Sequence, residues 1–387
     1  MVLQSKLQSN GARRYVSNSE NTPPASVLPS KSLASRLRTT RRRSRNNGGS
    51  PAKYNAEQAA RRSRTKAGPA QASLRFKIKA LPNPDVEMAD ASPSSTSAAN
   101  TTVPVMLPKE LGRPEYREVS REALVAADPE LVDVNPVFLR EGLEAFGPQL
   151  LKTLSSVRAS TTVDALPKEL SIVVHDLTTA LPSHMIAVYG PAPKPTTTTT
   201  PAPKRKVTLY PVHSLYLAAH CTRLPPFPAS TEPSPTIVPG ASSATYTVPV
   251  RPLCLPSPAT YPRLSTFLYA KRADVLLSSL LPITPPASLV PVPHDDDTPE
   301  PTAEQRKDER RVTLEYAHRL AQTYTPQALL QHALLVHGLW QNVCALGIFE
   351  DVLWEVIDVA WRVLLCAIAL GTGESVEGVL GPEVVEA

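Results

Sequence analysis

The fold is decided near the C-terminus, where residues 325–347 read TPQALLQHALLVHGLWQNVCALG and residues 348–371 read IFEDVLWEVIDVAWRVLLCAIALG. Thr325 precedes Pro326, and this pair is typical of a helix cap followed by the first helical residue. Each stretch is largely apolar and ends in glycine, which is typical of a helix C-terminus. The sequence therefore predicts a hairpin of two helices, the first ending near Gly347 and the second at about 370.

Proline content separates this hairpin from the chain before it. Pro326 is the only proline between residues 303 and 371, whereas 24 of the 42 prolines fall within residues 186–302. Proline interrupts helices and cannot donate to a sheet, so the proline-rich part favours loops and short elements. We expect linkers at 190–205 and 282–302, where proline is mixed with threonine and with aspartate.

Charge divides the chain a second time. Residues 1–79 contain 18 Lys and Arg against Glu20 and Glu57, a net charge of +16, whereas residues 80–387 carry a net −10. Residues 88–102 are nearly all Ala, Ser, Thr, Asp and Pro. Such polar and like-charged tracts bury too little apolar surface to fold. We therefore predict a disordered basic arm with a low-complexity spacer, and a folded body behind them.

The body is predicted to be α+β, mostly helical with a small sheet. Apolar spacing and turn residues predict helices at 116–127, 136–147, 166–180, 214–221, 258–281 and 304–321, and strands at 206–213 and 245–255. Pro249 and Pro252 would confine the second strand to an edge or a bulge. The predicted division is 1–103 (arm and spacer), 104–189 (helical), 190–205 (linker), 206–281 (strand-helix-strand-helix), 282–302 (linker), 303–373 (helical hairpin) and 374–387 (tail).

Two basic clusters in the arm suit nuclear import. Their members are Arg41, Arg42, Arg43 and Arg45, then Arg61, Arg62, Arg64 and Lys66, about 15 residues further on. Two spaced clusters are typical of a bipartite import signal. Ser44 and Ser63 each follow basic residues, so both are candidate phosphosites. The predicted location is the nucleus, with an import receptor as one partner, and the arm could also contact nucleic acid without sequence specificity.

Tryptophan forms the most distinctive side-chain pattern of the body. Trp354 and Trp361 are seven residues apart and share one stripe of a helix, and Trp340 lies in the preceding helix. A stripe of this kind is either core or a surface that binds a partner, since tryptophan is enriched where partners bury area. The sequence leaves these two alternatives open.

No catalytic, metal or cofactor site is predicted. His213, His220, Cys221 and Cys254 do not match a common zinc spacing, and an adjacent His220 and Cys221 would diverge on a helix. Walker loops, dinucleotide-binding glycine patterns and nucleophile elbows do not occur in the sequence. With no visible signal peptide and no uncharged apolar run of about 18 residues, we expect no membrane contact, and reduced thiols rather than disulfides.

Several blocks of the body resemble the clampless-type regulators of mating development in basidiomycete fungi. They read LPKEL at 107–111, RPEYREVSREAL at 113–124, VTLYPVH at 207–213, LAAHC at 217–221, FLYAKR at 267–272 and GLWQNVCALG at 338–347. The resemblance implies a non-enzymatic nuclear regulator of clamp-cell formation, acting through transcription factors of the mating pathway. It carries over no catalytic residue.

A second resemblance concerns BTB/POZ domains, which are protein-interaction modules. The order strand, helix, strand and helix over 206–281, with Leu268 and Tyr269 in the last helix, is similar to theirs. It implies protein binding and leaves homo-oligomerisation open. The alternative from a different class is a DNA-binding factor, in which the arm binds DNA and the body dimerises.

Overall fold

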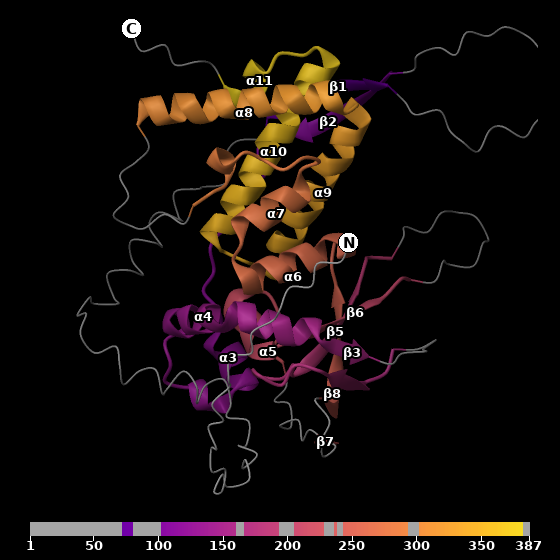
Figure 1. Ribbon diagram of the computed structural model, residues 1–387, viewed down its shortest axis with the longest axis vertical. Helices are drawn as coiled ribbons and strands as arrows, with labels where there is room; N and C mark the ends of the chain where they lie inside the picture. The colour runs from indigo at the N-terminus through magenta and orange to yellow at the C-terminus, as the bar shows by residue number, and fades with distance from the viewer. Residues whose placement is uncertain are drawn as a thin grey trace, which may run out of the picture.

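A computed structural model describes residues 72–79, 102–159, 166–192, 205–227, 236–237, 243–292 and 302–381. Figure 1 shows a lower part, in which helices pack on a sheet, and an upper part of long helices with a small strand hairpin. The prediction of an α+β fold that is mostly helical with a small sheet is therefore confirmed.

The sheet of the lower part has six strands. They are β3 (Val157–Ala159), β4 (Glu169–Val174), β5 (His184–Tyr189), β6 (Thr208–Val212), β7 (Thr236–Ile237) and β8 (Ala244–Cys254). The order is β3-β4-β8-β5-β6, and β7 pairs with the start of β8. Strand β8 runs antiparallel to β4 and parallel to β5. It is the central strand of the sheet and joins its two halves.

The prediction that Pro249 and Pro252 would confine β8 to an edge or a bulge is wrong for the edge, because β8 lies between β4 and β5 in the strand order. Strand β8 divides its pairing, because it pairs with β4 up to Pro249 and with β5 from Val250 onward. Among the described strands, the first half of β8 therefore pairs with β4 on one side and the second half pairs with β5 on the other. The exceptions are the two residues at its start that also pair with β7. Proline has no backbone N–H, and it is tolerated in a strand where that position faces a side without a partner strand. Pro252 in the second half of β8 is therefore compatible with the sheet.

Helices cover this sheet and link it to the upper part. They are α3 (Arg121–Ala127), α4 (Pro136–Ser155), α5 (Ser214–His220), α6 (Tyr261–Ala270) and α7 (Ala273–Leu280), with short 3-10 helices at Pro129–Leu131, Pro258–Thr260 and Ala287–Leu289. The Asn135 side chain caps α4 by accepting the Val137 N–H at 2.8 Å. The predicted helix at 258–281 is broken, because Lys271 adopts a left-handed backbone with φ of 53°.

Two other helix predictions are corrected. The segment 166–180 contains β4, whose residues Leu170, Ile172 and Val174 are buried while alternate residues face outward. This is the period of a strand, and pairing with β8 satisfies its backbone. The helix expected at 116–127 begins only at Arg121, because Ser120 has an extended backbone and caps the helix, and residues 111–119 form no helix or strand.

The upper part consists of α8 (Ala303–Thr323), α9 (Pro326–Leu346), α10 (Asp351–Thr372) and α11 (Glu377–Leu380). The predicted hairpin is therefore α9 and α10. Thr325 caps α9, and Gly347 ends it in a left-handed conformation with φ of 67°. Helix α10 is buried on most sides between α7, α8, α9 and β1. No helix in the described part of the chain is both long enough and apolar enough to cross a bilayer.

A strand within the predicted arm is the main correction to the domain division. Strand β1 (Ser73–Lys79) pairs antiparallel with β2 (Thr102–Pro108), and Phe76 and Ile78 are 2% and 4% exposed. Their burial against the upper helices outweighs the cost of ordering a cationic segment. Strand β1 therefore belongs to the folded body, which extends at least to residue 72.

Candidate interaction site on the C-terminal helices

The three tryptophans of the helical hairpin each donate the indole N–H to a backbone carbonyl. Trp354 and Trp361 are both 2% exposed, and Trp340 is half-buried. Trp354 bonds within the hairpin, to the Ile348 oxygen at 3.1 Å. Of the two alternatives for the stripe, the structure places Trp354 and Trp361 in the core.

The other two indoles hold a distant segment of the same chain. Residues 109–120 have no helix or strand and cross the hairpin, and we call them the strap. Trp340 donates to the Gly112 oxygen at 2.9 Å, and Trp361 donates to the Pro108 oxygen at 3.1 Å, where β2 meets the strap. Trp340 and Trp361 therefore hold the strap and the end of β2 against the hairpin.

Arg113 in the strap makes a further set of contacts with α10. It forms an ion pair with Asp358 at 2.7 Å, and its guanidinium lies 5.5 Å from the centre of the Trp354 ring. Three residues later, the Tyr116 ring packs edge-on against Phe349 with centres 5.2 Å apart. Arginine suits both kinds of contact, because its flat cation binds carboxylates and stacks on aromatic rings.

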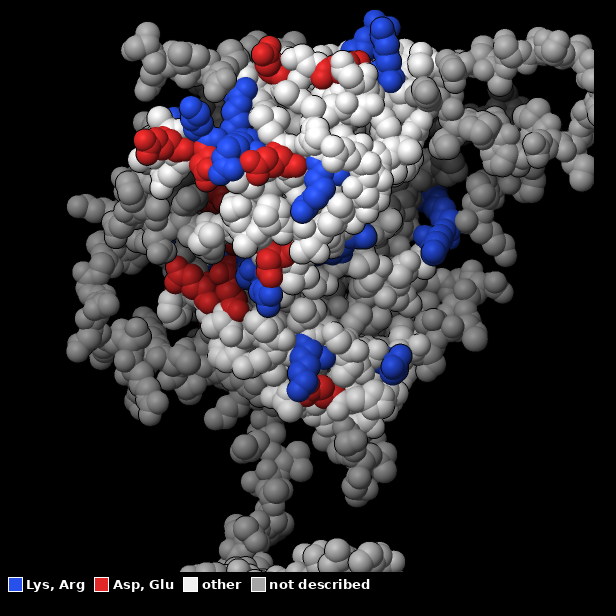
Figure 2. All heavy atoms as spheres, turned by 45° about the horizontal axis from the view of Figure 1, so that its top comes forward, with Lys and Arg blue, Asp and Glu red and all other residues white. Residues whose placement is uncertain are grey.

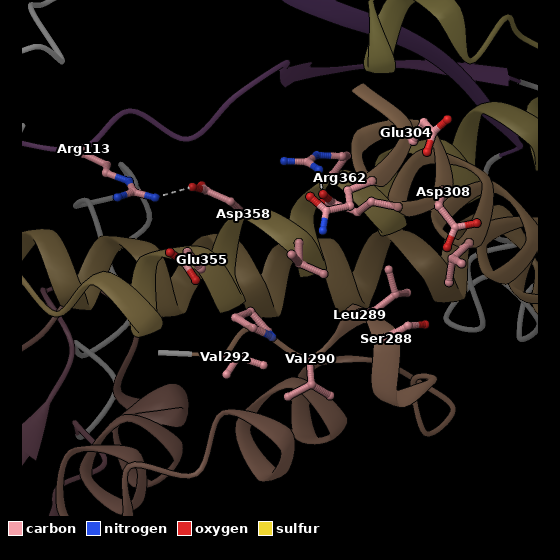
Figure 3. Close-up of a pocket in the computed structure, with 15 residues that line it drawn as sticks. Arg113, Ser288, Leu289, Val290, Val292, Glu304, Asp308, Glu355, Asp358 and Arg362 are labelled. Atoms are coloured by element: carbon pink, nitrogen blue, oxygen red, sulfur yellow. Dashed lines mark hydrogen bonds and ion pairs between the residues drawn. The ribbon is translucent and has the colours of Figure 1, made fainter. Parts of the chain in front are cut away.

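A groove of about 700 Å3 lies beside the strap, between α8, α10 and residues 288–292. Its acidic residues are Glu304, Asp308, Glu309, Glu355 and Asp358, and its basic residues are Arg113 and Arg362, which gives the lining a net charge of −3. Its apolar residues include Leu289, Val290, Val292, Val312 and Val359. Figure 3 shows Glu355 and Asp358 on α10, with Glu304 and Asp308 at the other end. We call this cavity the acidic groove.

Ion pairs border the acidic groove. Arg362 bonds Glu309 at 3.0 Å, in addition to the Arg113 pair with Asp358. Burial raises the pKa of Asp358, and the neighbouring Arg113 opposes that rise. Figure 2 shows acidic and basic side chains crowded together where α8 comes forward, whereas much of the remaining described surface in that view is uncharged. Charged side chains of both signs therefore surround this end of the molecule on the face shown.

The histidines and cysteines considered for metal binding have structural roles in the lower part. The His213 ring contacts the Ala180 oxygen at 3.0 Å and the Tyr269 hydroxyl at 3.3 Å. Burial raises the pKa of Cys221 to about 12, so its thiol stays protonated. Cys254 is exposed, and all four cysteines are free. Within the described ranges, no group of three or more His, Cys, Asp or Glu is placed to hold a metal.

His213 gives the fold a predicted acid sensitivity. Burial lowers the pKa of His213 from 6.5 to about 4, so below pH 6.5 the unfolded chain takes up a proton that the folded protein does not. The stability lost in this way is about 2 kcal/mol at pH 5. Chemical denaturation at pH 7.5 and pH 5 should show the wild type losing about this much more than His213→Gln. Equal losses in the two proteins would contradict the assignment.

One buried side chain joins the lower part to α9. Asn342 is fully buried, and its oxygen accepts the Ser257 N–H at 3.0 Å. Its amide nitrogen donates to the Ser257 oxygen at 2.7 Å and to the Thr260 hydroxyl at 2.8 Å. One turn earlier, Gly338 allows a close approach, because a Cβ there would lie 2.5 Å from the Ser257 hydroxyl. The two parts are therefore interlocked at this junction.

A lysine forms a second bridge between the parts. Lys271 bonds Glu144 of α4 at 2.9 Å and Glu350, just before α10, at 2.8 Å. Its left-handed backbone ends α6 and points the side chain to both carboxylates. Burial raises the pKa of Glu144, and Lys271 opposes that rise. The bridge thus fixes the turn between α6 and α7 against both parts.

Comparison with known families addresses the chain as a whole. Residues 114–256 match the model described as Clampless protein 1 N-terminal domain, and residues 274–382 match the one described as Clampless protein 1 C-terminal domain. Together the matches cover about two thirds of the 387 residues. This chain belongs to the clampless protein family. Comparisons with curated proteins and with solved structures found no match. Clampless domains indicate a role in clamp-cell development.

The two clampless domains meet at the contacts described above. The N-terminal match runs from the strap to just past β8, and the C-terminal match covers most of α7 and continues through α11. Ser257, Thr260 and Lys271 lie between the matched ranges, where they contact α9, α4 and the start of α10. The hairpin of β1 and β2 precedes both ranges. The clampless domains therefore pack together partly through residues that neither range includes, and partly through direct contacts between the ranges, such as Tyr116 with Phe349.

Several predicted site residues lie in the part of the chain that the structure does not describe. The import residues Arg41, Arg42, Arg43, Arg45, Arg61, Arg62, Arg64 and Lys66, and the phosphosites Ser44 and Ser63, lie outside the described residues. Sequence reasoning missed Arg113, Asn342 and Lys271. All three belong to the blocks that carry the clampless resemblance, and this was the available signal.

Proposed function

We propose that this clampless protein is a nuclear, non-enzymatic regulator of fungal sexual development. It acts in clamp-cell formation by binding transcription factors of the mating pathway. The observation that carries the proposal is the match to both clampless domains. The two basic clusters of the arm support nuclear import, because paired clusters of this kind bind import receptors.

The acidic groove supports action through protein contacts. Its lining combines a net charge of −3 with apolar side chains, and Val292 is 69% exposed. A basic segment that also carries apolar side chains would neutralise the carboxylates and bury Val290 and Val292. Transcription factors contain basic segments because they must bind DNA phosphates. The proposed partner is therefore a basic segment of such a factor.

Affinity purification tests this proposal directly. Tagged full-length protein from mating cells should recover transcription factors of the pathway. A groove variant with Glu304→Gln, Asp308→Asn and Glu355→Gln should recover them several-fold less well. The matched control carries Glu122→Gln, Glu141→Gln and Glu169→Gln, which are exposed, lie outside the groove and change the net charge equally. Equal recovery with both variants would reject the groove as the docking surface.

The environment of the thiols supports a non-enzymatic role. Burial raises the pKa of Cys366 to about 12 and that of Cys344 to about 11, so neither is an activated nucleophile at neutral pH. Buried His213 is neutral and bonded within the core. These groups stabilise the fold.

The resemblance to BTB/POZ domains fits the same proposal. Strand β6, helix α5, strand β8 and helix α6 occur in the predicted order, with the short strand β7 between α5 and β8 and a 3-10 helix before α6. A protein-interaction module of that type would add homo-oligomerisation to partner binding. Sedimentation of the full-length protein at several concentrations would detect the oligomer.

A second candidate function is DNA binding by the arm, with the body as dimeriser. The observation in its favour is that Arg75 and Lys77 are exposed on β1, so basic charge continues from the arm onto the folded body. Binding to random duplex that falls steeply with salt, and disappears without residues 1–71, would favour this function.

Nuclear accumulation is predicted to depend on the basic clusters. Deleting residues 1–71, or introducing Ser44→Glu with Ser63→Glu, should lower the nuclear signal of a fluorescent fusion. A phosphate adds about −1.5 to −2 charges, and glutamate imitates part of that change within each cluster. At 0.5 M salt the melting temperature should stay unchanged, because the deletion ends before β1.

The control for this prediction is Ser44→Ala with Ser63→Ala, which leaves the charge of both clusters intact. This variant should accumulate in the nucleus as the wild type does. An undiminished nuclear signal after deletion of residues 1–71 would mean that the arm is not the import signal.

A further inference from the structure

We propose that the second basic cluster, residues 61–66 (RRSRTK), docks in the acidic groove of the same molecule. The inference deepens the proposed function and rests on it, because the groove is the same docking surface. The arm would then occupy the groove until a basic segment of a partner replaces it.

Charge complementarity is the first argument. The cluster carries four positive charges in six residues, and residues 1–71 together carry a net +13. The groove lining carries a net −3, and residues 80–387 are also acidic in balance. Arginine binds carboxylates through two parallel hydrogen bonds, so an arginine-rich segment matches a groove with carboxylates on both walls.

The existing ion pairs do not block the groove. Glu309 pairs with Arg362, and Asp308 pairs with Arg311. All four side chains are more than 40% exposed, and exposed pairs of this kind contribute only about 0–1 kcal/mol. An incoming arginine can therefore share or replace these partners at low cost. Glu304 and Asp308 lie one turn apart on α8 and present carboxylates on that wall (Figure 3).

The position of the chain is the second argument. The Ala72 oxygen accepts the Lys109 N–H at 2.9 Å, and Lys109 lies four residues before Arg113 in the groove lining. Lys66 is six residues before Ala72, so these residues reach at most about 20 Å. Arg61 is eleven residues before Ala72 and reaches at most about 40 Å. The arm therefore joins the described body at the start of the strap, four residues before Arg113 of the groove lining.

This short connection favours docking in the same molecule. A short tether gives its two ends an effective concentration in the millimolar range, so even a weak contact is populated. The first cluster, at residues 41–45, is 27 or more residues before Ala72 and has a longer connection. Residues 61–66 are therefore the favoured occupant. Ser63 lies within them, and a phosphate there would oppose docking in an acidic groove.

Limited trypsin digestion of the full-length protein tests the proposal. Trypsin cuts after Lys and Arg, and docking should protect residues 61–66 while residues 41–45 stay accessible. The measured quantity is the ratio of cleavage at 61–66 to cleavage at 41–45, compared between the wild type and the groove variant Glu304→Gln/Asp308→Asn/Glu355→Gln. At low salt, we expect this ratio to be about tenfold lower in the wild type. A tenfold difference corresponds to about 1.4 kcal/mol. At 0.5 M salt, the wild type should lose its protection, because screening weakens exposed contacts.

Matched variants decide between explanations. The control Glu122→Gln/Glu141→Gln/Glu169→Gln should keep the protection of the wild type. Unequal intrinsic cutting of the two clusters cancels, because the same ratio is compared between proteins. Equal ratios in the wild type and the groove variant would overturn the proposal. So would loss of protection in Asp295→Asn/Asp296→Asn/Asp297→Asn but not in the groove variant. The recovery of transcription factors by affinity purification is a separate measurement. Docking can therefore fail the trypsin test while the proposed function passes its own, and the two failures are distinguishable.

Discussion

Deleting residues 1–79 is expected to lower the free energy of unfolding by at least about 5 kcal/mol, because it removes the buried Phe76 and Ile78. At 0.5 M salt, where docking of residues 61–66 is screened, deleting residues 1–71 is expected to leave the free energy of unfolding unchanged. The two side chains are 2% and 4% exposed, and their strand makes seven register pairs with β2. Loss of this size is comparable to the whole stability of many domains. The longer deletion should therefore be partly or fully unfolded.

Chemical denaturation of both deletions is the measurement, and two point variants of the full-length chain support it. Phe76→Ala should cost about 3–5 kcal/mol. Its control is Arg75→Ala, the neighbouring residue on the exposed face of β1, which should change stability by less than about 0.5 kcal/mol. If the 1–79 deletion kept the full free energy of unfolding, β1 would not belong to the folded body.

Trp354→Ala is expected to cost about 3–5 kcal/mol of stability, since the ring is core and truncation leaves a cavity. The side chain is 2% exposed, and its indole N–H bonds the Ile348 oxygen. The substitution also removes the ring that lies beside Arg113. Chemical denaturation of the full-length protein should show a lower midpoint for the variant than for the wild type.

The control for Trp354→Ala is Leu334→Ala on the adjacent helix, where the side chain is 50% exposed. This change removes apolar atoms from the surface and should alter stability by less than about 0.5 kcal/mol. Unchanged stability of Trp354→Ala, with failed partner binding, would instead identify the ring as a partner contact. Unchanged stability together with unchanged binding would contradict both roles of the stripe.

Elements with local signals could be predicted from the sequence. Asn135 before Pro136 and Thr325 before Pro326 begin helices as expected, because a cap and a proline act within one helical turn. The sequence of β4 also indicates a strand, because Leu170, Ile172 and Val174 recur at every second residue. The prediction of a helix there was wrong because it assumed a helical period. Correct use of local spacing would have placed that strand.

Contacts between distant residues could not be predicted. Trp340 bonds Gly112, 228 residues away, and Trp361 bonds Pro108, 253 residues away. The strap itself has no repeating pattern, because single contacts to α9 and α10 hold it. Asn342 gives the same lesson, since its three hydrogen bonds depend on the position of residues 257–260.

The sequence by itself determined the separation of a basic arm from an acidic body, the helical hairpin, and the clampless resemblance, because charge, proline spacing and short motifs are properties of neighbouring residues. Only the tertiary structure decided where the arm ends and what it can reach. Strand β1 is stable because Phe76 and Ile78 are buried against helices more than 200 residues later. That burial places Ala72 beside Lys109 at the start of the strap, four residues before Arg113, which lines the acidic groove.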